Sequence, residues 1–166
     1  MSKEAIKRLY GNKFRTRACG ICLSGSDILL VRHKALTSIG YFFSPPGGGM
    51  HYGEEATHCL KREFLEESGL EIEVVRFLFV HEFLSPPLHA IELFFEVRPT
   101  GGSLKVGFDP EMEQHEQIIE SVDYLSPAEV DREKGEQMHH MINLVTQPKE
   151  LLNWQGYFKF DGKTLK

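Results

Sequence analysis

Three glutamates near the middle of the chain, Glu63, Glu66 and Glu67, have a spacing that could create a metal site. They stand at i, i+3 and i+4, which places their carboxylates on one face of a helix. No lysine or arginine lies between them to relieve the repulsion. Carboxylate oxygens suit a hard divalent cation such as Mg²⁺, so we expect a metal site here. The alternative for three such acids alone is a solvated acidic face.

The helix that must carry these acids is expected to span about 54–68, with Gly69 in the C-terminal capping position. Ahead of it, residues 44–49 read SPPGGG, which predicts an irregular loop whose backbone can approach another group closely. The stripe that bears the acids should pack inward and place them at the rim of the buried surface. It continues upstream with small and apolar residues, namely Ala56, Cys59 and Leu60.

A longer pattern around the acids resembles a known family motif. Segment 48–70 reads GGMHYGEEATHCLKREFLEESGL, which is similar to the Nudix box, Gly-x5-Glu-x7-Arg-Glu-U-x-Glu-Glu-x-Gly-U, with U a bulky apolar residue. The resemblance to the MutT-like Nudix hydrolase family implies an α+β protein, an α/β/α sandwich around a central mixed β-sheet. It also implies metal-dependent cleavage of the diphosphate bond in a nucleoside diphosphate derivative. The matching residues are Gly48, Glu54, Arg62, Glu63, Phe64, Glu66, Glu67, Gly69 and Leu70.

The resemblance assigns roles to individual residues. Arg62 and Glu54 would pair with each other and brace the helix. A bound metal would neutralise the diphosphate, lower the pKa of a water molecule and align it for attack. The ligands of this Mg²⁺ or Mn²⁺ would be Glu63, Glu66, Glu67 and the backbone carbonyl of Gly47.

The general base stays open between Glu63 and an acid of the long polar loop at 99–117. Glu113 and Glu116 are the loop candidates, and we place Glu116 ahead because it lies nearer the following strand. A loop of this length in a compact domain is often functional. The alternative for each is an ordinary solvated loop acid.

One position departs from the pattern common among such proteins, which have Glu-x-Gly-Glu where this chain has His51-Tyr52-Gly53-Glu54. His51 could ligate a softer metal or point to solvent, and we expect the latter. The departure puts in doubt any metal ligand at this position.

Residues outside the motif must select the substrate. Pro86 lies 16 residues beyond Leu70, which resembles the spacing in ADP-ribose and sugar-nucleotide pyrophosphatases, although a simple hairpin break is the alternative. Arg15, Arg17 and Arg32 could hold phosphates and Phe83 could stack on a base, with surface charge and core packing as alternatives. We expect ADP-ribose or a sugar nucleotide as substrate. The other hypotheses are a housecleaning (d)NTP pyrophosphohydrolase and a non-catalytic nucleotide-sugar sensor.

The whole chain of 166 residues is expected to form one Nudix domain, with a core at about 14–133 and a C-terminal helix and aromatic tail at 134–166. Ser126 and Pro127 should open one helix. The expected strands are 17–23, 27–32, 41–43, 71–84, 89–98 and 117–125, with a last helix near 137–145.

Composition excludes several classes of protein. A net charge of −5 argues against a nucleic-acid polymer as partner. The sequence contains neither an apolar run of 18 residues nor an apolar leader, so we expect no membrane segment. The cysteines, Cys19, Cys22 and Cys59, should be buried thiols. We therefore expect a cytoplasmic protein that acts on a nucleotide-derived small molecule, with a homodimer through the aromatic C-terminus as a further expectation.

Overall fold

The computed structural model describes residues 10–34, 39–108, 110 and 117–160. Its helices are α2 (Ala56–Ser68), α3 (Pro127–Arg132), α4 (His140–Asn143) and the 3₁₀ helix η2 (Pro148–Asn153). Its strands are β1 (Lys13–Ser24), β2 (Asp27–Lys34), β3 (Tyr41–Ser44), β4 (Gly47–Gly49), β5 (Leu70–Ser85), β6 (Leu88–Gly102), β7 (Ile119–Leu125) and β8 (Gly156–Phe160).

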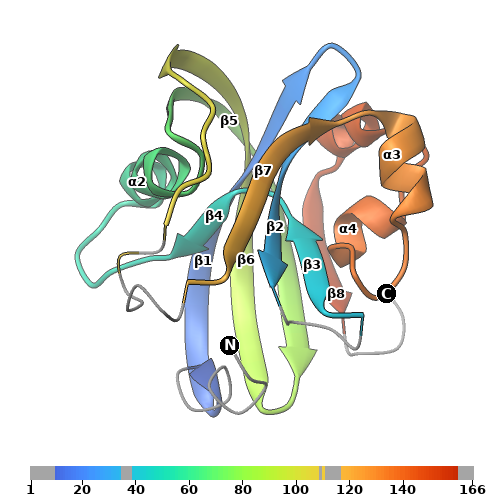
Figure 1. Cartoon of the computed structure of the whole chain (residues 1–166). Helices are drawn as coiled ribbons and strands as arrows, with labels where there is room; N and C mark the ends of the chain where they lie inside the picture. The colour runs from blue at the N-terminus through green and yellow to red at the C-terminus, as the bar shows by residue number, and fades with distance from the viewer. Residues whose placement is uncertain (1–9, 35–38, 109, 111–116, 161–166) are drawn as a thin grey trace.

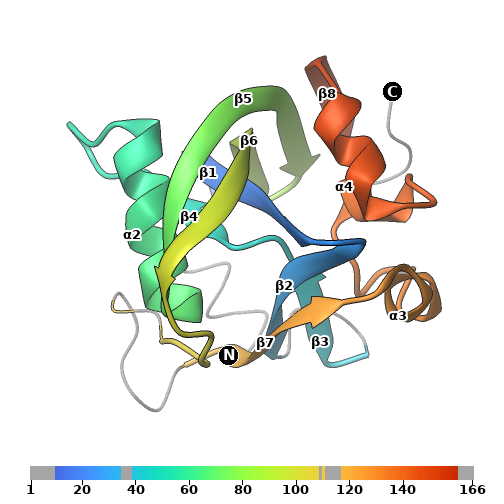
Figure 2. The ribbon, with the colours of Figure 1, turned by 90° about the horizontal axis from the view of Figure 1, so that it is seen from above.

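The strands form a curved mixed sheet between two layers of helices. Helix α2 lies on one side, and α3 and α4 lie on the other (Figures 1 and 2). This arrangement confirms the predicted α/β/α sandwich. None of the helices in the described ranges is long and apolar enough to cross a membrane.

Strand β1 holds the sheet together. It pairs in parallel with β6 along residues 13–22, and β6 pairs antiparallel with β5, which confirms the expected hairpin across 85–88. Strand β8 extends the sheet in parallel on the far side of β5. At its other end β1 forms a hairpin with β2, which carries β3 and β7 on its two edges.

The glycine run differs from its expected form. Gly47–Gly49 is the short strand β4, antiparallel to β1, with Gly47 opposite Cys19, so the prediction of an irregular loop is wrong for these residues. The two backbones approach so closely that a Cβ on Gly47 would overlap the carbonyl oxygen of Ala18. The glycines have no side chains to block this close pairing. The feature that suggested a loop therefore allows the strand to form here.

Two apolar clusters fill the two faces of the sheet. Alternation along β1 sends Cys19 and Ile21 to one face, and Ala18 and Cys22 to the face covered by α2. All three cysteines are free and buried, as expected. The predicted α2 stripe also packs inward, since Cys59 and Leu60 are fully buried and Ala56 is partly buried against the same cluster.

Two helix ends follow the signals read from the sequence. Gly69 ends α2 in the left-handed conformation with φ of 70°, and Ser126 opens α3 in a capping box with Glu129. The helix expected at 137–145 is only the four-residue α4. It is short because His139, whose ring accepts a hydrogen bond from the backbone N–H of Met141, begins it late.

The aromatic tail contributes to the core of the same chain. Trp154 and Phe158 each lie with their ring centres 5.7 Å from that of Phe79 in β5. Strand β8 continues this contact by pairing with β5. The segment therefore supports the sheet face opposite α2.

Candidate active site

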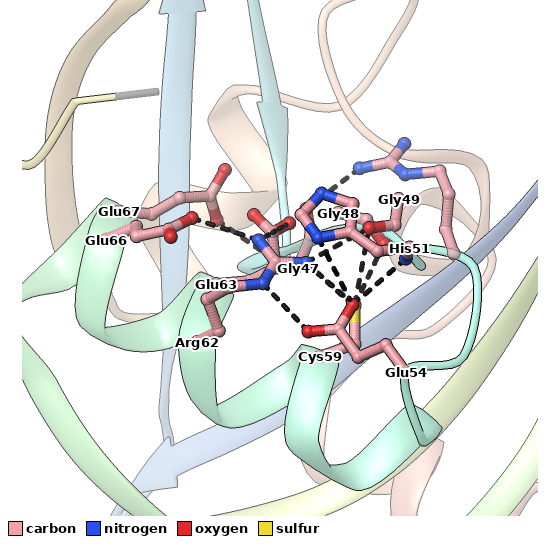
Figure 3. A network of polar contacts seen from close by, with 11 residues as sticks. Gly47, Gly48, Gly49, His51, Glu54, Cys59, Arg62, Glu63, Glu66 and Glu67 are labelled. Atoms are coloured by element: carbon pink, nitrogen blue, oxygen red, sulfur yellow. Dashed lines mark hydrogen bonds and ion pairs between the residues drawn. The ribbon is translucent and has the colours of Figure 1, made fainter. Parts of the chain in front are cut away.

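The three glutamates of the motif lie on the side of α2 that faces β4 (Figure 3). Glu67 is 8% exposed and accepts a hydrogen bond of 2.9 Å from the backbone N–H of Gly47. Glu63 packs directly under Gly48, where a Cβ would overlap its carboxyl group. The side chain of Glu66 is 23% exposed. The helix thus presents its acids to the glycine backbone at the rim of the buried surface.

Arg62 changes the charge balance expected for this face. Its Nε and Nη2 donate to the two carboxylate oxygens of Glu54 at 2.9 and 3.0 Å. Its Nη1 donates to Glu63 at 2.7 Å and to Glu66 at 3.1 Å. The expectation that no basic residue relieves the repulsion between the acids is therefore wrong, because the Arg62 side chain donates to both Glu63 and Glu66.

The surroundings shift the pKa values of Glu54 and Glu63 in opposite directions. The hydrogen bonds from Arg62 lower the pKa of Glu54 to about 2. Burial raises the pKa of Glu63 above its ordinary value, against the lowering effect of Arg62, and the charge of Glu66 raises it further. A carboxylate whose charge is disfavoured in this way gains from a nearby cation. The atoms available to bind such a cation are all oxygens, which suits Mg²⁺ or Mn²⁺.

Gly47 contacts both sides of the sheet through its backbone. Its N–H donates to Glu67 on the α2 side, and its carbonyl oxygen accepts a hydrogen bond of 3.0 Å from Nη2 of Arg17. Arg17 precedes Cys19 and Ile21 in the alternation of β1, so it belongs to the face opposite α2. The carbonyl keeps a second lone pair, which another donor or a metal can use.

Sequence reasoning missed a buried charge cluster beside Arg17. Glu92 on β6 is 3% exposed, and its Oε1 accepts a hydrogen bond of 3.2 Å from Nη1 of Arg17. Its Oε2 lies 2.8 Å from Nδ1 of His81 and 3.0 Å from Nε2 of His139. One signal was available, because Glu92 interrupts an apolar strand at an inward position of its alternation with Phe94. A charge in such a position requires buried partners.

Arg32 contacts a different part of the fold from the acids. Its guanidinium lies 4.1 Å from the ring centre of Tyr41 and forms an ion pair of 3.0 Å with Glu120. It therefore braces β2 against β3 and β7. Arg17 donates a hydrogen bond to the glycine strand, whereas the guanidinium of Arg15 lies 4.0 Å from the ring centre of Tyr10.

The remaining predicted residues are spread over the molecule. Phe83 stacks on His140, with ring centres 5.6 Å apart, and Pro86 lies in the turn between β5 and β6. The side chain of His51 is 54% exposed, with Nδ1 3.9 Å from Glu54. The two loop acids proposed as general base, Glu113 and Glu116, lie outside the described residues.

Comparison with known proteins identifies the family of this chain. The family model of the NUDIX domain matches residues 14–145. An ADP-ribose pyrophosphatase of Methanocaldococcus jannaschii is 33% identical over 116 residues, which cover 65% of this chain and 68% of that protein. The 8-oxo-dGDP phosphatase of Mus musculus is 31% identical over 117 residues, or 68% of this chain. That match spans only 35% of the length of the mouse protein.

A solved structure shares the fold at low sequence identity. The MutT NUDIX hydrolase from Burkholderia pseudomallei has a TM-score of 0.64 and 18% identity, with 81% of this chain and 96% of that chain covered. The family model spans most of the sequence, including the helix α2 that bears the three glutamates. This chain belongs to the Nudix hydrolase family.

Proposed function

We propose that the chain is a metal-dependent pyrophosphohydrolase that cleaves the diphosphate bond of a nucleoside diphosphate derivative, with ADP-ribose or a sugar nucleotide as substrate. The contacts of Glu63 and Glu67 with the backbone of Gly47–Gly49, with Glu66 on the same face of α2, carry this proposal. A cluster of carboxylates beside open backbone favours a polyanion that binds through divalent metal. The archaeal relative named for ADP-ribose supports this substrate class.

The residues of α2, together with Glu54 just before it, would divide between metal binding and support of the site. Arg62 and Glu54 hold the acid face in place through their paired hydrogen bonds. A bound divalent metal would supply charge neutralisation of the diphosphate and a more acidic water. Its proposed ligands are Glu63, Glu66, Glu67 and the carbonyl oxygen of Gly47.

Arg17 is the residue we propose to bind a phosphate of the substrate. One hydrogen bond from each terminal nitrogen goes to Glu92 and Gly47. Each terminal nitrogen of a guanidinium carries two hydrogens, so Nη1 and Nη2 each keep one N–H beyond these bonds, and the side chain is 24% exposed. The free donors and the positive charge suit a phosphate oxygen. Roles for Arg32, Phe83 and Pro86 in substrate binding stay predictions.

A product analysis tests the proposed reaction. Incubation with ADP-ribose and Mg²⁺ is expected to release AMP and ribose 5-phosphate, because the attack occurs at the diphosphate bridge. Mass spectrometry identifies the products, and excess EDTA is expected to stop the reaction by removing the metal. Release of pyrophosphate from dGTP, without turnover of ADP-ribose or a sugar nucleotide, would instead favour a housecleaning triphosphatase.

The mouse relative favours a second candidate substrate, an oxidised purine nucleoside diphosphate. Its hydrolysis between the phosphates would release a nucleoside monophosphate and inorganic phosphate. The same assay with 8-oxo-dGDP and unmodified dGDP decides between the two substrates. A kcat/KM for 8-oxo-dGDP above that for ADP-ribose would make the second candidate the preferred one.

The general base is proposed to be Glu116, with Glu113 and Glu63 as the other candidates. Glu116→Gln is expected to lower kcat roughly 100-fold or more with little change in KM, since the base acts in the chemical step. Steady-state kinetics on the substrate found above measure both constants, with Glu113→Gln measured in parallel as the competing candidate. An unchanged rate in Glu116→Gln would transfer the role to Glu113 or Glu63.

We also propose that the whole chain forms a single Nudix domain. Support comes from β8, which pairs with β5, and from Trp154, which packs against Phe79 in the same core. A homodimer through the C-terminal segment stays a prediction.

A further inference from the structure

We propose that Glu92, held by His81 and His139, is a positioning residue for Arg17. It fixes the guanidinium against the carbonyl of Gly47 and orients its free donors toward a substrate phosphate. The inference rests on the proposed function, because Arg17 acts only where a phosphate binds.

A continuous chain of hydrogen bonds supports this role. Two histidine rings contact one oxygen of Glu92, and Arg17 contacts the other at 3.2 Å. Arg17 then donates to the Gly47 carbonyl at 3.0 Å, and the N–H of Gly47 donates to the carboxylate of the metal-site helix at 2.9 Å. The chain runs from β5 through β6, β1 and β4 to α2, in the order His81, Glu92, Arg17, Gly47 and Glu67.

Glu92 can hold Arg17 because it keeps its charge in the interior. Burial by itself would raise the pKa of Glu92, but His139, His81 and Arg17 hold it well below its usual range. A buried carboxylate without such partners would be strongly destabilised. The two histidines therefore stabilise the ionised form that pairs with the guanidinium.

The same residues could suggest a metal centre, since the ligand atoms of His81, Glu92 and His139 lie within 4.8 Å of one another. The hydrogen bonds of His139 oppose this. Its Nδ1 accepts from the backbone N–H of Met141 at 3.4 Å, so the neutral ring carries its proton on Nε2, which faces Glu92. Burial lowers the pKa of His139 and keeps the ring neutral. Ligation through Nε2 would require the tautomer with its proton on Nδ1, which would face the N–H of Met141 donor to donor, so we read the group as a hydrogen-bond network.

Positioning matters for Arg17 because its side chain is long and the guanidinium must have a specific orientation to bind a phosphate. Fixing one nitrogen on Glu92 and the other on Gly47 sets the plane of the guanidinium before substrate arrives. Gly47 is also bonded to Glu67, so a displaced Arg17 would disturb the strand that faces the metal ligands. Loss of Glu92 should therefore act on catalysis through Arg17.

A double-mutant cycle tests this coupling. Glu92→Gln and Arg17→Gln are each expected to lower kcat/KM for ADP-ribose about 10- to 100-fold, as misplacement of a binding group does. The double variant is expected to be no worse than Arg17→Gln alone, because Glu92 acts through that residue. Glu96→Gln is the matched control, since Glu96 lies on the same strand and pairs with Arg76 at 2.7 Å. Additive losses in the double variant would overturn the proposal.

His81 provides a second pair of variants should Glu92→Gln fail to fold. His81→Asn keeps an N–H near the position of Nδ1, and it is expected to retain activity within about threefold, whereas His81→Leu removes the donor and should resemble Glu92→Gln. Melting temperatures measured in parallel separate positioning from general destabilisation. Equal activity of the Asn and Leu variants would contradict the inference.

Binding of AMP, measured by calorimetry over the same cycle, distinguishes two kinds of failure. A wild type that cleaves no nucleotide overturns the proposed function, and the inference is then decided by whether Glu92→Gln and Arg17→Gln weaken AMP binding non-additively. A wild type that is active but shows additive variants overturns the inference alone.

Discussion

Glu67→Gln is expected to lower kcat roughly 1,000-fold, equivalent to about 4 kcal/mol of transition-state stabilisation. Glu67 stands at the centre of the proposed metal site, where it is buried and bonded to Gly47. Glutamine has nearly the same shape and can still accept the Gly47 N–H through its amide oxygen. It cannot supply the negative charge that a divalent cation needs. Steady-state kinetics and Mn²⁺ titration should therefore show lost turnover and weakened metal binding.

The matching control lies on the same helix. Glu55 caps the start of α2 without a side-chain hydrogen bond to the backbone, and its side chain is 75% exposed. Glu55→Gln removes the same charge from α2 and is expected to leave kcat within about twofold, since an exposed charge contributes little. Both variants should keep the melting temperature of the wild type. Normal Mg²⁺-dependent turnover in Glu67→Gln would refute the assignment of the metal site.

Gly48→Ala is expected to lower kcat/KM about 100-fold while stability changes little. A Cβ at Gly48 would overlap the carboxyl group of Glu63. That group is the end of a flexible side chain, so it can move aside at low cost in stability. A shift of about 1 Å in a catalytic group is enough for a loss of this size. Kinetics together with a thermal melt measure the two effects separately.

The neighbouring glycine provides the comparison. A Cβ at Gly49 would meet its nearest atom, Nη2 of Arg15, at 3.5 Å, which is an ordinary van der Waals contact. Gly49→Ala therefore places the same methyl group on the same strand without displacing Glu63. It is expected to remain close to wild type. Equal activity of the Gly48 and Gly49 variants would show that Glu63 does not need its present position.

Local patterns predicted much of the fold because they report interactions between near neighbours. The helix that carries the acids was expected at 54–68 and is observed as Ala56–Ser68, since the apolar stripe and the capping Gly69 both act within a few residues. The hairpin of β5 and β6 was predicted for the same reason, because two alternating runs flank a proline turn. Two short strands escaped prediction, β4 and β8, because their hydrogen bonds depend on the distant partners β1 and β5.

The candidate site likewise contains features that the sequence predicts and features that it does not. The spacing of Glu63, Glu66 and Glu67 within one helix was sufficient to place them on one face. The contacts that surround them join residues far apart in the chain, as in the bond between Arg17 and the Gly47 carbonyl. Such contacts cannot be predicted from a periodic pattern in the sequence.

By itself, the sequence determined the family motif, the acid face of α2, the glycines ahead of it and the sandwich architecture. The tertiary structure alone decided that Gly47 joins Glu67 to Arg17 and that Arg17 is held by Glu92. The physical reason is the range of the interactions. Helix periodicity and capping act over a few residues, whereas a buried ion network exists only after β1, β4 and β6 pair and exclude water from its charges.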